Sequence, residues 1–124
     1  MRRGWTAIGV AALALAMATP AAAMNVTEFL AKAQALKAKG VLAMFSPDLK
    51  LLGAEMRTIT REYRAEQQAA KAAGRRFDSC PPEKVKLDHN QLLADLERIP
   101  PAQRGMSMKS AFALMMKRRY PCPG

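Results

Sequence analysis

Residues 46–74 read SPDLKLLGAEMRTITREYRAEQQAAKAAG and carry the strongest helical signal in the chain. The stretch begins with a capping serine, a proline at the first helical position and an acid in the first turn, and it stops at Gly74. We expect one helix from about Asp48 to Ala73, about 40 Å long at 1.5 Å per residue. Because no stretch after residue 23 shows sustained strand-like alternation, the predicted fold class is all-α.

This predicted helix separates its side chains into an apolar stripe and two charged flanks. The apolar stripe consists of Leu49, Leu52, Met56, Ile59, Tyr63 and Ala70. The basic flank consists of Lys50, Arg57, Arg61, Arg64, Lys71 and Arg75. The acidic flank consists of Asp48, Glu55, Glu62 and Glu66. Two interpretations stay open: both flanks are solvated, or the basic flank binds an acidic partner or the acidic flank of a second copy.

Three shorter helices complete a small domain of about four helices. They are expected over residues 25–39, 88–99 and 107–120, each beginning at a side chain that can cap a helix. Residues 41–45, which read VLAMF, are expected to form a short buried bridge, and residues 75–86 a loop. Side chains expected to face inward include Val26, Phe29, Leu30, Leu92, Leu93, Leu96, Ile99, Met108, Ala111, Phe112, Met115 and Met116.

The first 23 residues have the pattern of a cleavable secretory signal peptide. A basic start is followed by an apolar run over residues 7–18 and by three alanines that end at Ala23. Cleavage after Ala23 would leave a single helical domain, residues 24–124, in the periplasm or outside the cell. The run of about 12 residues is shorter than the roughly 20 that cross a bilayer, so no stable membrane insertion is expected after cleavage. The alternatives are an uncleaved anchor and initiation at Met24.

The two cysteines, Cys80 and Cys122, both follow the predicted cleavage point. In an oxidising compartment such a minimal pair predicts one disulfide that staples the domain. A metal site is the competing interpretation, but a single histidine, His89, and the lack of a C-x-x-C motif leave too few ligands. We therefore expect neither a metal nor a cofactor.

No catalytic arrangement of side chains stands out, so no enzymatic activity is expected. His89 has no evident partner, and Ser46 and Ser107 are explained as helix caps. Removal of the two arginines of the signal segment lowers the formal net charge from +10 to +8. This charge suits an anionic lipid, an anionic polymer or an acidic protein, whereas scarce aromatic residues and the predicted export argue against nucleic acid.

From Cys80 onward the sequence carries a series of motifs: CPPEKV at 80–85, QLLADL at 91–96, IPPAQR at 99–104, SMKSAFALMM at 107–116 and RRYPCP at 118–123. Residues 80–123 resemble the C-terminal half of the Rap/Tai family of immunity proteins, which accompany type VI secretion systems. The paired Cys-Pro and Tyr-Pro-Cys-Pro ends also favour the bridge between Cys80 and Cys122. Residues 24–79 lack the further cysteines and the Tyr/Gly-containing stretch of many members. Toxin contacts vary within such families, so no toxin-contacting residue is carried over.

The resemblance implies a periplasmic, often dimeric protein that binds a peptidoglycan amidase toxin and blocks its active site. The expected function is therefore that of an exported, non-enzymatic binding protein, and the basic flank is the hypothetical partner-binding site. A second copy of the chain is a further expected partner. The alternative is a basic periplasmic helical protein that binds anionic envelope components or has an unknown structural role.

Overall fold

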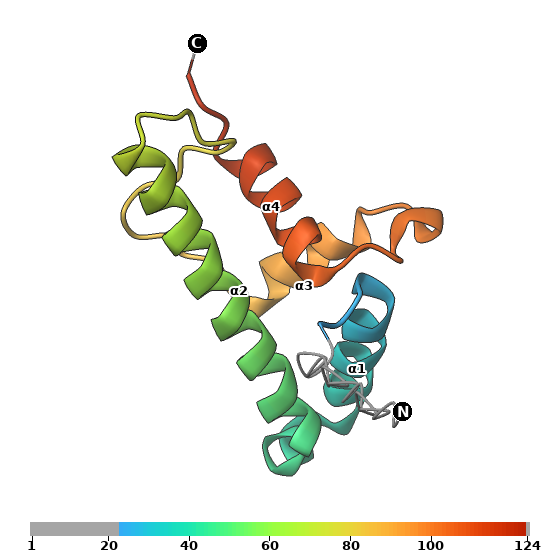
Figure 1. Cartoon of the computed structure of the whole chain (residues 1–124). Coiled ribbons are helices and arrows are strands. Elements are labelled where there is room, and N and C mark those ends of the chain that lie inside the picture. The colour runs from blue at the N-terminus through green and yellow to red at the C-terminus, as the bar shows by residue number, and fades with distance from the viewer. Residues whose placement is uncertain (1–22, 124) are drawn as a thin grey trace, which may run out of the picture.

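The computed structural model describes residues 23–123, which form α-helices, two short 3-10 helices and no named strand (Figure 1). The elements are α1 (Val26–Lys39), η1 (Gly40–Phe45), α2 (Pro47–Ala72), α3 (His89–Glu97), η2 (Pro101–Gln103) and α4 (Met108–Arg119). The all-α prediction is confirmed. Nearly all of the predicted signal segment lies outside the described residues. None of the described helices is long and apolar enough to span a membrane.

The four α-helices begin where local capping chemistry places their starts. The side chains of Asn25 and Ser46 accept hydrogen bonds from backbone N–H groups at the first turns of α1 and α2. Asp88 and Gln91 form a reciprocal capping box at α3, and Ser107 caps α4. Each cap satisfies an N–H that has no partner within its own helix, so these short motifs fix helix starts without help from distant residues.

The helix α2 runs along one side of the molecule, with α1 beside its first turns and α4 beside its later turns (Figure 1). The short helix α3 packs against both α1 and α4. The core lies between these helices, and its most deeply buried large side chains are Val26, Leu96, Met108 and Met116. Most side chains that were predicted to face inward are buried. Leu93 is only partly buried.

The start of the described chain is joined to the start of α4. Met24 is 4% exposed, and its carbonyl accepts a hydrogen bond of 2.9 Å from the backbone N–H of Met108. The backbone N–H of Val26 donates to the carbonyl of Met106 at 3.0 Å. These hydrogen bonds therefore join the first core residue of the described chain to the start of its last helix.

The prediction that residues 41–45 form a buried bridge is wrong. They form η1, in which Val41, Leu42, Met44 and Phe45 are 81%, 66%, 74% and 86% exposed. The stretch turns the chain from α1 into α2 at the end of the helix pair, beyond the core, so only Ala43 packs against the core. For the same reason Leu49 of the predicted apolar stripe is 44% exposed, and the buried part of the stripe begins at Leu52.

Candidate binding surface

The carboxylates of the acidic flank of α2 contact other parts of the same chain. They contact α1, α4 and the start of the described chain: Asp48 with Lys32 at 3.5 Å, Glu55 with the Met24 N–H at 3.2 Å, and Glu62 and Glu66 with Lys109 at 3.2 and 2.7 Å. Hydrogen bonds to Glu66 and then to Glu62 raise the pKa of Lys109. These groups are partly exposed, so each pair contributes roughly 0–1 kcal/mol. Their main effect is to fix which way the charged faces of α2 point.

The basic flank, by contrast, faces outward. All six of its residues are exposed. Within residues 23–123 no ion pair involves any of them. Five of these residues lie on α2, and Arg75 follows its end at Ala72. The carboxylates of the acidic flank thus have partners within the molecule, whereas the basic flank has no ion-pair partner within residues 23–123.

Beside the basic flank lies a groove between α2, the segment 81–87 and α4, with a volume of about 290 Å³. We call it the proline groove. Arg57, Arg64 and Gln67 line it from α2, and Pro81 and Pro82 line it from the facing loop. The apolar side chains that line it are Met56, Tyr63, Val85, Leu87, Phe112 and Met116. The structure thus places two arginines of the predicted site at a partly apolar groove, whereas Lys50, Arg61, Lys71 and Arg75 do not line it.

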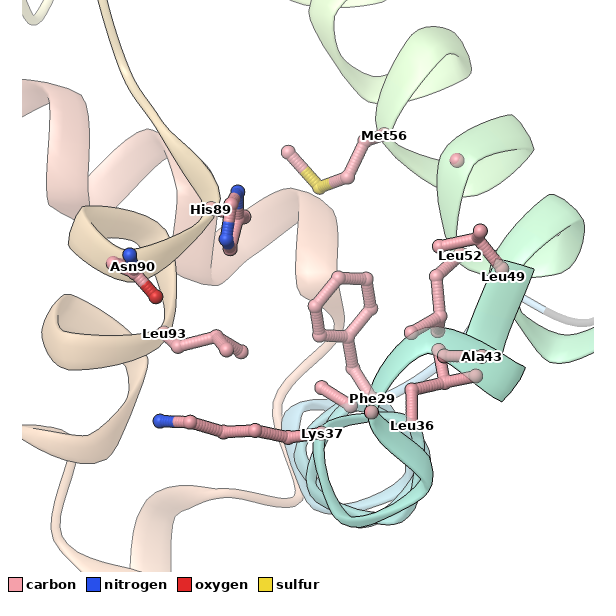
Figure 2. A pocket seen from close by; sticks show the side chains of 13 residues that line it. Phe29, Leu36, Lys37, Ala43, Leu49, Leu52, Met56, His89, Asn90 and Leu93 are labelled. Carbon is pink, nitrogen blue, oxygen red and sulfur yellow. The ribbon is translucent and has the colours of Figure 1, made fainter. Parts of the chain in front are cut away.

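A second hollow, of about 440 Å³, lies between α1, η1, α2 and α3 (Figure 2). We call it the apolar hollow. Figure 2 shows Phe29, Leu52 and Leu93 around it, with His89 facing the side chain of Met56. Met56 also lines the proline groove, so the two depressions are neighbours along the same helix. Sequence reasoning missed both, because a depression depends on how helices pack and leaves no periodic signal.

Tyr63 attaches the loop after α2 to the core. Its hydroxyl forms a hydrogen bond with the hydroxyl of Ser79, which is 2% exposed. Its ring packs edge-on against Phe77 and Phe112, with centroids 5.4 and 5.3 Å apart. The aromatic contacts and the hydrogen bond hold the loop where it enters the wall of the proline groove.

The predicted disulfide between Cys80 and Cys122 is confirmed. It joins positions 42 residues apart, with a Cα–Cα distance of 4.9 Å. Next to it the backbone N–H of Cys80 donates to the carbonyl of Tyr120 at 2.8 Å. Because Pro81 follows Cys80 directly, the bridge anchors the proline wall of the groove to the end of α4.

We expect Tyr63→Phe to lower the free energy of unfolding by about 1–3 kcal/mol, because it leaves the buried hydroxyl of Ser79 without its partner. The double variant Tyr63→Phe with Ser79→Ala removes both hydroxyls and should recover much of that loss. Urea unfolding of the three proteins at pH 7 measures both effects. Equal stability of the single variant and the parent would show that the pair contributes nothing.

Ionisation of Tyr63 should also make the free energy of unfolding depend on pH. Burial raises the pKa of Tyr63 above its usual value of 10.0, against smaller lowering effects of Ser79 and Arg64. A raised pKa in the folded state means that folding favours the protonated phenol. This stabilisation is therefore complete below about pH 10 and decreases as the pH rises through the folded-state pKa. Unfolding measured on both sides of pH 10 should show a steeper loss for the parent than for Tyr63→Phe.

Among the described residues no group of three or more histidine, cysteine or acidic side chains is placed to hold a metal ion. Comparison of the chain with protein-family models, with curated proteins and with solved structures gives no match. The Rap/Tai resemblance of residues 80–123 therefore stays a prediction from the sequence. The candidate site consists of the basic flank and the proline groove beside it.

Proposed function

We propose that this protein is an exported, non-enzymatic binding protein that holds an acidic segment of a partner protein against the basic flank and the proline groove. The observation that carries the proposal is the unequal use of the two flanks of α2. The acidic flank is partnered inside the molecule, whereas the basic flank has no ion-pair partner within residues 23–123. A surface of this kind steers an oppositely charged partner and selects its orientation.

The groove adds what charge alone does not provide. Apolar side chains give a partner area to bury, and Arg57 and Arg64 stand at the same depression to pair with carboxylates. Arginine presents a planar, bidentate donor that suits carboxylates well. An apolar anchor flanked by charged contacts is typical of interfaces in which a few residues supply most of the affinity. The matching partner is a segment that carries acidic side chains around one or two apolar ones.

The Rap/Tai resemblance supplies the proposed identity of that partner, an amidase toxin of a type VI secretion system. Cys80 and Cys122 lie at the two ends of the region that carries the resemblance, and Pro81, next to Cys80, lines the groove. A homodimer in which the basic flank of one copy binds the acidic flank of another is the weaker alternative, because the acidic flank already has partners within its own chain. In such a dimer the basic flank of a second copy would compete with Lys32, Lys109 and the N–H of Met24 for the same carboxylates.

The proposal includes export with cleavage after Ala23. Met24 is buried, and its backbone nitrogen lies 3.2 Å from Oε1 of Glu55. Cleavage would convert this amide into a charged α-amino group next to a carboxylate, so the processed chain would gain an ion pair at its first residue. N-terminal sequencing of the exported protein tests the position of the cut.

The binding proposal is tested first by capture and then by kinetics. Tagged Met24–Gly124 is used to capture proteins from secretions of bacteria with type VI systems, and the captured material is eluted in steps of salt. An amidase that is retained at high salt is then purified, and its peptidoglycan hydrolysis is measured with and without the captured chain. We expect a complex of fixed stoichiometry and loss of hydrolysis.

Reversal of charge in the variant Arg57→Glu, Arg61→Glu, Arg64→Glu should slow association with that amidase by at least tenfold, since steering acts on the association rate. The matched control is Arg98→Glu, Lys117→Glu, Arg118→Glu, which changes the net charge equally at exposed positions away from the groove. Its effect should be much smaller. Equal slowing by both variants, or capture of only anionic material that is released at moderate salt, would favour the envelope-binding alternative instead.

A further inference from the structure

The turn between α1 and α2 carries the four most exposed large apolar side chains of the described chain. Val41, Leu42, Met44 and Phe45 of η1 are between 66% and 86% exposed. We call these four side chains the η1 cap. Isolated exposed apolar residues are ordinary, but a contiguous group of large ones usually marks an interaction surface. The cap lies at one extremity of the molecule, where the chain reverses (Figure 1).

The charges around the cap have one predominant sign. Lys37 and Lys39 precede it at the end of α1, and Lys50 follows it in the first turns of α2; all three are exposed. The one carboxylate between residues 37 and 50 belongs to Asp48, and it is paired with Lys32. The apolar tip is thus flanked along the chain by three exposed lysines.

We propose that the η1 cap is a membrane-surface anchor, which inserts its apolar side chains among the lipids of an anionic bilayer while the lysines contact the headgroups. The charge and the shape of the cap favour an anionic bilayer as its binding partner. Anionic phospholipids supply both the negative charge and the apolar interior that such a tip requires. A second copy would bring the same lysines against one another. This anchor lies on the surface and does not span the membrane, and it does not depend on the proposed toxin partner.

The anchor and the proline groove use different parts of α2. The cap adjoins Pro47, the first residue of the helix, whereas the groove is lined from Met56 to Gln67, about two and a half to five and a half turns further along. A protein bound to a bilayer through the cap would therefore keep the groove accessible. The apolar hollow, which includes Gly40, Ala43 and Leu49, lies directly beside the cap and is the part of the surface nearest the lipid.

The test uses Met24–Gly124, which holds the described core, with vesicles of pure phosphatidylcholine and vesicles with equal parts of phosphatidylglycerol. The only tryptophan of the chain is Trp5, so Phe45→Trp gives this protein a unique fluorophore at the cap. We expect its emission to shift to the blue and to be quenched by brominated acyl chains with the anionic vesicles, and to change little with the neutral ones.

Loss of one cap side chain should weaken binding to the anionic vesicles by about 10- to 100-fold, the range for burial of a large apolar side chain. Phe45→Ser is the test variant, and Leu114→Ser, at a residue 41% exposed on α4, is its matched control. Lys39→Gln should also weaken binding, and Lys117→Gln should not. Circular dichroism verifies that each variant is folded.

Three outcomes would overturn the anchor. Phe45→Ser could bind the vesicles as tightly as the parent. The Arg57→Glu, Arg61→Glu, Arg64→Glu variant could lose vesicle binding while Phe45→Ser keeps it, which would mean attraction to the basic flank alone. Sedimentation could reveal a dimer that Phe45→Ser dissociates, with no vesicle binding, which would mean that a second copy covers the cap. None of these outcomes affects capture of an amidase, so this proposal and the proposed function fail separately.

Discussion

Replacement of both Cys80 and Cys122 by serine is expected to lower the free energy of unfolding by about 4 kcal/mol. The bridge closes a loop between positions 42 residues apart, and its loss releases that conformational entropy in the unfolded chain. A domain of this size typically has a total stability of about 5–15 kcal/mol, so the bridge is expected to supply a large share of it. Urea unfolding of the oxidised parent and of the variant gives the difference.

Reductant provides the control for this experiment. It should bring the parent close to the variant and leave the variant unchanged, because the variant has no thiol. A variant as stable as the oxidised parent would mean that the unfolded chain is already constrained or that the bridge strains the fold. The variant should also lose affinity for any partner of the proline groove, because the bridge anchors the wall that contains Pro81 and Pro82.

The second large effect is expected at Phe112, where substitution by alanine should lower the free energy of unfolding by about 3–5 kcal/mol. Phe112 is 4% exposed, packs against the ring of Tyr63 and lines the proline groove. Its removal loses the burial of a large ring and leaves a cavity that the surrounding helices fill only in part. Thermal or urea unfolding measures this loss.

Leu114 is the matched position on the same helix, two residues further on and 41% exposed. Leu114→Ala should change the stability by no more than about 0.5 kcal/mol, as expected for a surface substitution. If the two variants were equally destabilised, the assignment of the buried and exposed faces of α4 would be wrong. Phe112 and Leu114 are both large and apolar, so most of the difference between the two variants should come from burial and the lost ring contact.

The helix starts could be predicted because they are local. Asn25, Ser46, Asp88 and Ser107 each accept a hydrogen bond from an N–H two or three residues away, so a few letters of sequence contain the whole interaction. The disulfide was predictable for a different reason, since two cysteines allow a single pairing. The short helix η2 was missed because one turn of 3-10 helix after a proline has no periodicity.

The η1 cap could not be predicted, because a run of five apolar residues has the same composition whether it crosses a core or turns around its edge. What determines its exposure is the packing of α1 against α2, which ends before Val41. For the charged flanks of α2, too, the sequence could not predict which one makes contacts within the molecule. The sequence places them on opposite sides of one helix, but only the position of Lys109 on α4 and of Lys32 on α1 assigns the acidic flank to internal contacts.

The joint between the start of the chain and α4 has a consequence for the order of events during synthesis. The N–H groups of Val26 and Thr27 donate to the carbonyls of Met106 and Arg104, and the N–H of Met108 donates to the carbonyl of Met24. A chain that leaves the ribosome with its N-terminus first must therefore expose residues 24–27 long before their partners are made. These contacts between the two ends of the described chain therefore form only after the start of α4 has been synthesised.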